Sequence, residues 1–185
     1  MSDTPTLSAF INAILEHTPA LENVLKAITV LRKTKKQQVT EMQKLEQNFS
    51  ALKADIAGLS MSRGSGGRPT KSIELIRSLD SLLSELRGMD RNVSAMVGQL
   101  KAVNQALEEI KERRDRIVKM LYALRAGSPE EHARMAENLY QDKCIAIEDA
   151  IFEQEEGLPS SFKWLRSDIS EIKDEVLSLK EHLRA

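Results

Sequence analysis

Few side chains in this sequence have the types and the spacing that catalysis or metal binding requires. His17, His132 and His182 are far apart and do not have the spacing of metal ligands. Cys144 is the only cysteine, and no histidine stands near it in the sequence to activate its thiol. No Glu-x-x-His motif is present, so a di-iron site is not expected. The sequence therefore predicts a protein that is not an enzyme and holds neither a metal nor a cofactor.

A short basic segment is the other candidate for chemistry. Residues 61–69 contain three glycines and a proline, and Arg63, Arg68 and Lys71 lie in or beside the segment without a nearby acid. These three cations suit contact with phosphate, either on a nucleic acid or on another anion. The segment lacks the Gly-Lys-Ser/Thr ending and the preceding strand of a phosphate-binding loop. A plain solvated linker is the alternative interpretation.

A heptad pattern in the middle of the chain, from Leu79 to Leu124, predicts a long helix. Thirteen of its fourteen seam positions are apolar, and Arg114 is the exception. A seam of this length is typical of a helix that lies against other helices. The seam positions are Leu79, Leu82, Leu86, Met89, Val93, Met96, Leu100, Val103, Leu107, Ile110, Arg114, Ile117, Leu121 and Leu124.

A second heptad pattern precedes the first one. Ten of twelve seam positions between residues 21 and 59 are apolar, with Lys35 and Gln38 as the exceptions. Because the glycine-rich segment is short, the two helices are expected to pair as an antiparallel hairpin, with Leu21 opposite about residue 109. The polar seam residues either select the partner and register or extend their long side chains to solvent.

Helix start and stop signals divide the chain into four parts. Thr18 and Pro19 can cap and begin a helix, and Ser128, Pro129 and Glu131 have the arrangement of a capping box. Residues 157–159, Gly-Leu-Pro, predict another break. The expected parts are a short amphipathic helix over 1–18, the hairpin over 19–126 with its turn at about 61–69, an acidic helix over 127–157 and a coiled-coil helix over 158–185.

The central seam is wider than one partner requires. Ile76, Leu83, Val97 and Val118 add a further apolar row beside it. Such a stripe is typical of a helix that touches two neighbours, so either the acidic helix or a second chain is expected to cover it.

The C-terminal helix favours self-association. In a parallel homo-oligomer, Asp168 and Glu175 would face Lys173 and Lys180 of another copy, and both pairs attract. Whether the helix pairs between chains or folds back on its own chain stays open. The predicted oligomerisation residues are Phe162, Leu165, Ile169, Ile172, Val176, Leu179 and Leu183.

Composition agrees with long helices rather than a compact globule. The chain has 185 residues, of which 30% are charged and only 4% aromatic, with a net charge of −1. A single cysteine suits a reducing compartment, and neither a signal peptide nor a spanning segment is expected, so we predict a cytoplasmic protein. The fold class predicted is all-α: an elongated coiled-coil bundle with a long antiparallel hairpin and a C-terminal coiled-coil helix.

The function expected from these patterns is assembly. The chain would act as a scaffold that oligomerises and tethers partner macromolecules through helix–helix contacts, with itself or another helical protein as partner. One alternative is a nucleic-acid or phosphate-surface binder that uses the basic helix faces and the turn. A second alternative is a membrane-associated bundle in which residues 7–15 insert as an amphipathic helix.

Overall fold

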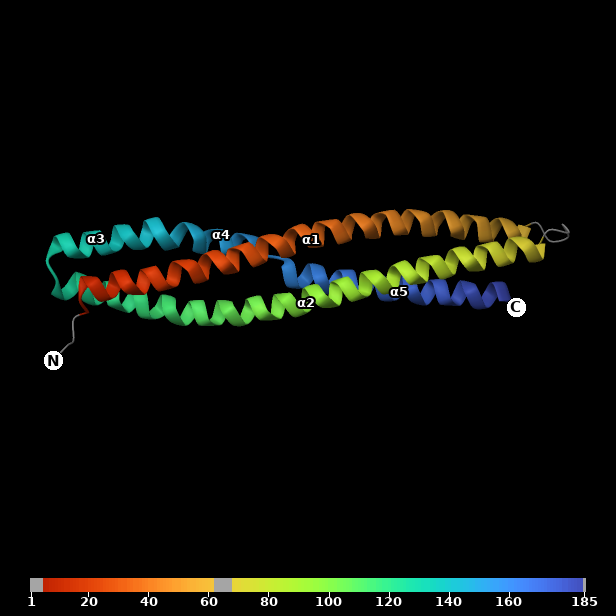
Figure 1. The fold of residues 1–185 in the computed structure, drawn as a ribbon. Coiled ribbons are helices and arrows are strands. Elements are labelled where there is room, and N and C mark those ends of the chain that lie inside the picture. The colour runs from red at the N-terminus through yellow and green to blue at the C-terminus, as the bar shows by residue number, and fades with distance from the viewer. Residues whose placement is uncertain (1–4, 62–67, 185) are drawn as a thin grey trace. The chain divides into compact units, whose positions relative to one another are not determined.

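The fold is all-α. A computed structural model describes the backbone of residues 5–61 and 68–184 and the side chains of residues 5–59 and 72–184. Every regular element in these ranges is helical (Figure 1). The predicted class, a helical bundle built on a long hairpin, is confirmed. The elements are α1 (Leu7–Met61), α2 (Arg68–Gly127), α3 (Glu130–Tyr140), a π-helical turn (Gln141–Ile145), α4 (Ala146–Glu155) and α5 (Leu158–Arg184).

The chain forms two compact units. The first unit contains Met1–Arg32 and Gly98–Leu158, and the second contains Lys33–Val97 and Pro159–Ala185. Helices α1 and α2 each supply one segment to either unit. The third helical segment differs: it comes from α3, the π turn and α4 in the first unit, and from α5 in the second.

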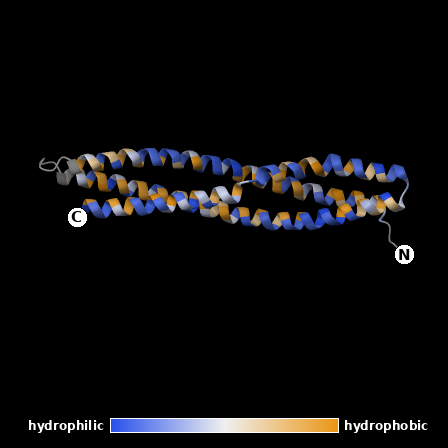
Figure 2. Ribbon diagram, turned by 180° about the vertical axis from the view of Figure 1, so that it is seen from behind, coloured by the Kyte–Doolittle hydropathy of each residue, from blue (hydrophilic) through white to orange (hydrophobic). Residues whose placement is uncertain are grey.

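In the first unit, α1 and α2 run antiparallel and α3–α4 lies alongside them (Figure 1). Leu21, Leu107 and Ile110 line one small cavity together with Ile151 of α4. Leu21 of α1 therefore lies opposite the part of α2 around residue 109, as the hairpin pairing predicted. Hydrophobic residues form stripes along the helices rather than covering their whole surface (Figure 2).

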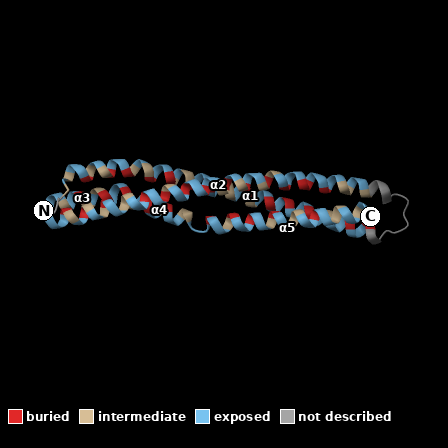
Figure 3. Cartoon of the chain, turned by 90° about the horizontal axis from the view of Figure 1, so that it is seen from below, coloured by how far each residue is buried: buried red, intermediate tan, exposed pale blue. Residues whose placement is uncertain are grey.

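In the second unit, α5 packs on the segments of α1 and α2. Phe162, Leu165, Ile169 and Val176 of α5 are buried, as are most seam residues of the two hairpin helices in this unit (Figure 3). Each of these side chains recurs three, four or seven residues after the last, which places them on one side of the helix.

The structure differs from the sequence prediction at Pro19. We expected a break between residues 18 and 19, but α1 runs through Pro19 without interruption. The Thr18 hydroxyl donates to the Ile14 carbonyl at 2.9 Å instead of capping a new helix. Ile14, His17 and Leu21 are all buried on the two sides of the proline, so tertiary packing outweighs the roughly 3 kcal/mol that an interior proline costs.

The junctions around α3 and α4 also differ in detail from the prediction. The residue that precedes α3 is Pro129, no side chain caps the first turn, and Glu130 and Glu131 lie in that turn. Carboxylates are favourable there because the first turn carries unpaired N–H groups. Between α4 and α5, Gly157 has a φ of 81°, a left-handed conformation that glycine adopts without steric cost.

Candidate functional site

A buried polar cluster in the first unit is the most unusual feature of the described side chains. His17 of α1 is 0% exposed and Glu148 of α4 is 6% exposed. The His17 Nε2 atom lies 3.4 Å from Glu148 Oε1. A carboxylate is rarely buried without partners, because the loss of hydration is costly. The cluster is therefore the place where this unit departs from an ordinary apolar core.

Three helical elements besides α4 supply partners for Glu148. The Tyr140 hydroxyl of α3 donates to its two oxygens at 3.4 and 3.3 Å. The Arg114 Nε atom of α2 lies 3.7 Å from Oε2. With His17 of α1, the carboxylate therefore joins all three helical segments of the unit through groups that complement its negative charge.

The π-helical turn explains how α3–α4 can present this cluster. Ala136, Tyr140, Cys144 and Glu148 are buried at intervals of four residues. An α-helix repeats every 3.6 residues, so three successive steps of this size would rotate the last side chain away from the core. The wider turn at Gln141–Ile145 corrects the phase, and Glu148 faces inward as a result.

Burial keeps the Tyr140 hydroxyl and the Cys144 thiol protonated. Burial, followed by the negative charge of Glu148, raises the pKa of Tyr140 to about 12. Burial also raises the pKa of the Cys144 thiol, whose sulfur lies 3.8 Å from Thr18 Oγ1. Tyr140 is therefore a neutral hydrogen-bond donor, and Cys144 is a poor nucleophile because the reactive thiolate is disfavoured.

One atom of the cluster is left without a partner. His17 Nδ1 is buried and has no hydrogen-bond partner among the described residues. A buried polar atom in this state costs about 1–3 kcal/mol. Over the described part of the chain, no group of three or more His, Cys, Asp or Glu side chains is placed to hold a metal ion. The arrangement suits structural recognition between helices better than catalysis or metal binding.

Two grooves that border the hairpin of the first unit differ in polarity. A groove of about 510 Å³ between α1 and α2 is mainly apolar. A groove of about 290 Å³ between α2 and α3–α4 is mixed, with Arg114, Tyr140 and Glu148 at its inner side. The apolar groove is lined by Lys26, Ala27, Val30, Leu31, Gln99, Ala102, Val103 and Ala106.

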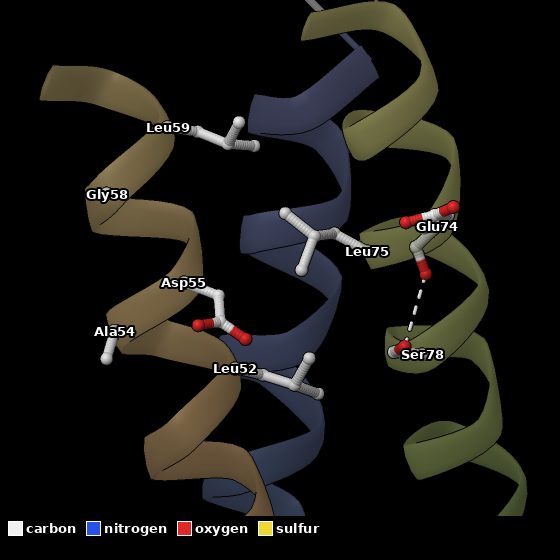
Figure 4. A pocket seen from close by; sticks show the side chains of 8 residues that line it. All are labelled: Leu52, Ala54, Asp55, Gly58, Leu59, Glu74, Leu75 and Ser78. Atoms are coloured by element: carbon white, nitrogen blue, oxygen red, sulfur yellow. Dashed lines mark hydrogen bonds between the residues drawn. The ribbon is translucent and has the colours of Figure 1, made fainter. Parts of the chain in front are cut away.

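A third groove lies in the second unit, between α1 and α2. It measures about 570 Å³, and Figure 4 shows Leu59 and Leu75 extending toward the space between these helices. Asp55 and Glu74 add carboxylates from the two helices, while Ser78 donates to the Glu74 carbonyl at 3.1 Å. Its lining contains neither histidine nor cysteine.

The predicted oligomerisation residues lie inside the second unit. Phe162, Leu165, Ile169 and Val176 are buried there, and Ile172, Leu179 and Leu183 are half-buried. Two of the four charges predicted to pair between copies contact the chain's own hairpin. Glu175 accepts from Lys53 at 3.2 Å, and Lys180 pairs with Asp80. Self-association through this seam stays a prediction, and it would require α5 to leave α1 and α2.

The predicted anion contacts are not tested by the structure. Arg63 lies outside the described residues, and so do the side chains of Arg68 and Lys71. Two apolar residues of the predicted membrane helix, Phe10 and Ile14, are buried in the first unit, whereas Leu15 is 65% exposed. No helix in the described ranges is both long enough and apolar enough to cross a membrane.

Sequence reasoning missed two members of the polar cluster. Arg114 stands out as the one polar position of the central seam, and the structure gives it Glu148 as a partner. His17 was weighed only as a metal ligand, and Tyr140 and Glu148 were not singled out. No sequence signal marks these residues, because the four-residue spacing from Ala136 to Glu148 becomes apparent only once their burial is known.

Comparison with known proteins adds no relative. No protein-family model, no curated protein and no solved structure matches this chain. The class of the protein therefore follows from its own geometry: an all-α bundle protein in two units, with one buried polar cluster.

Proposed function

We propose that this chain is a non-enzymatic assembly protein that associates through helix–helix contacts. Its contact surface is the apolar groove between α1 and α2 in the first unit. The observation that carries the proposal is the lining of that groove. Of its eight residues only Lys26 is charged, and Val30 remains 60% exposed. Such a surface gains free energy when another apolar surface covers it.

The small side chains along the groove favour a helix as the occupant. Ala27, Ala102 and Ala106 leave room for another backbone to approach, and helix separation falls as contact side chains become smaller. A second copy of the chain is the occupant we choose. A two-fold interface places the same patch on both partners, and a patch with one charge at its rim creates little like-charge repulsion.

The same geometry argues against the seams as contact surfaces. The seam of α5 is covered by α1 and α2, and Ile151 and Tyr140 cover the stripe of the first unit. An assembly built on either seam would first have to expose buried aliphatic side chains at about 25 cal/mol per Å². The open groove carries no such cost.

The test is the solution mass of the full chain and of two matched variants. Ala102→Glu places a carboxylate in the groove, whereas Gln105→Glu places the same charge on an exposed position of α2 outside its lining. Multi-angle light scattering should show a dimer for the parent chain and for Gln105→Glu. Ala102→Glu should be a monomer, since burying an unpaired charge is costly.

Two results would contradict the proposal. A parent chain that stays monomeric as its concentration rises has no self-association to explain. A dimer that survives Ala102→Glu uses another surface. Circular dichroism of both variants checks that the helical content is unchanged, so that a lower mass reports the interface and not unfolding.

A further inference from the structure

We infer that residues 130–155 form a strap that opens as one unit while α1 and α2 of the first unit stay paired. The strap comprises α3, the π-helical turn and α4. Its opening uncovers the apolar stripe that it protects on α1 and α2. Val118 and Leu121 flank its polar groove, and Leu21, Leu107 and Ile110 surround Ile151.

The strap has little apolar anchorage. Its buried residues, Glu148 aside, are Ala136, Tyr140, Cys144 and Ile151, so only one is a large aliphatic side chain. A fully buried Val, Leu, Ile or Phe stabilises a fold by about 1.5–3 kcal/mol. Segments with few buried apolar contacts open at lower free energy than the rest of a protein.

The contacts of the polar cluster contribute little net free energy to keeping the strap closed. Glu148 is the strap's link to His17 of α1 and Arg114 of α2. When the strap opens, the carboxylate and its partners regain water, which offsets much of what the contacts contribute. An aliphatic contact has no such compensation, because exposing it to water only costs free energy.

Backbone features at three places favour such an opening. The π-helical turn interrupts regular α-helical hydrogen bonding in the middle of the strap. Pro129 precedes the strap, and Gly157 with a φ of 81° follows it, so a conformational break lies at each end.

Like charges add to the tendency. Three of the strap's acids have cationic partners: Glu130 pairs with Arg134, Glu137 with Arg125, and Glu148 with Arg114. Asp149 and Glu153 stand four residues apart on one exposed face, an arrangement that destabilises a helix by a few tenths of a kcal/mol. In the described structure no ion pair is formed by Glu131, Asp142, Asp149, Glu153, Glu155 or Glu156.

The test is amide hydrogen exchange of the full chain, read peptide by peptide by mass spectrometry. Amides of 130–155 should exchange at least about ten-fold faster than those of 14–28 and 103–124, which belong to the same unit. Glu148→Gln should accelerate exchange in 130–155 by a further factor of about ten, because it weakens charge-assisted hydrogen bonds. Glu153→Gln is the control: it makes the same change at an exposed position of α4, and because it only relieves the repulsion from Asp149 it should not accelerate exchange.

Two outcomes would overturn the inference. In one, residues 130–155 exchange at the same rate as the hairpin segments of their unit, which means that the three segments open together. In the other, Glu148→Gln accelerates all three segments equally. Measuring exchange on the Ala102→Glu variant, which is expected to be monomeric, makes the result independent of the proposed dimer. If the mass of this variant does not change, the proposed dimer interface is wrong, but the exchange rates still test the strap.

Discussion

The third helical segment of each unit is held in a different way. In the second unit, α5 buries four large apolar side chains: Phe162, Leu165, Ile169 and Val176. In the first unit, the segment 130–155 buries one large aliphatic side chain, Ile151, together with the polar cluster around Glu148. The two segments have similar lengths, so they differ in which side chains they bury and not in the length of helix available.

The comparison separates what stabilises a helix from what places it. Aliphatic burial contributes free energy but tolerates several arrangements of similar volume. The Glu148 cluster contributes less stability, yet it is satisfied only when Tyr140, Arg114 and His17 meet one carboxylate. Buried ionic groups elsewhere are weak evidence for stability and can specify a register. We interpret Arg114, the polar seam position, in this sense.

The units also differ in charge. By sequence, the first contains 11 basic and 16 acidic residues, for a net charge of −5, and the second contains 16 basic and 12 acidic residues, for +4. Most of the negative charge of the first unit lies on residues 130–156, where nine residues are acidic and two are basic. Self-repulsion therefore falls on the segment with the least apolar anchorage.

The largest effect is expected from removing an aromatic anchor of α5. Phe162→Ala should lower the free energy of unfolding by about 3–5 kcal/mol, since a buried ring is replaced by a cavity. Urea denaturation followed by circular dichroism measures the loss, and hydrogen exchange should place it in the second unit. Trp164→Ala is the matched control, because Trp164 is 54% exposed and its removal should change stability little.

An equal loss for these two variants would break the comparison. It would mean that α5 is not anchored by its buried seam. A Phe162→Ala loss spread evenly over both units in the exchange data would show instead that the units unfold as a single body.

A smaller effect is expected from alkaline pH in the first unit. The pKa of Tyr140 is raised from 10.0 to about 12, first by burial and then by the charge of Glu148. Below pH 10 the phenol is protonated in both states, so its effect on stability is constant. Between pH 10 and 12 the unfolded chain loses this proton first, and stability should fall by up to about 2–3 kcal/mol.

Thermal unfolding between pH 9 and 12 measures this loss. The stability of Tyr140→Phe should fall less steeply with rising pH over that range than the stability of the parent chain, because the titrating phenol is absent. Tyr122→Phe should keep the parent's pH dependence, since Tyr122 lies on the surface at 62% exposure. Identical slopes for the parent and Tyr140→Phe would contradict the assignment of the buried hydroxyl as a donor to Glu148.

Most of the fold could be predicted from the heptad spacing of apolar residues in the sequence. The all-α class, the hairpin register near Leu21 and the apolar face of α5 follow from apolar residues that recur every three or four positions. Pro19 was misread because a local breaker signal says nothing about the packing on either side of it. Buried Ile14 and Leu21 keep α1 continuous there.

The polar cluster could not be predicted in the same way. Its members are separated by up to 131 positions in the chain, and only the folded helices bring His17 to Glu148. Glu148 also belongs to a segment whose acids otherwise lie on the surface, so its type does not mark it as buried. Its inward direction depends on a π-helical turn, which no regular periodicity reveals.

The smallest effect is expected from two glycines of α2, one in each unit. Gly88 belongs to the second unit and Gly98 to the first, and a Cβ atom added at either would meet no atom within 4 Å beyond its chain neighbours and the surrounding helix backbone. Neither glycine is therefore required for a close contact, and each should cost the helix about 0.5–1 kcal/mol relative to alanine. Gly88→Ala and Gly98→Ala should each raise stability by this amount in urea denaturation.

The hydrogen-exchange patterns of these two variants sharpen the comparison of the units. If Gly98→Ala slows exchange in 103–124 but not in 130–155, the strap opens independently of the helix beneath it, whereas equal slowing in both means that the polar cluster couples them.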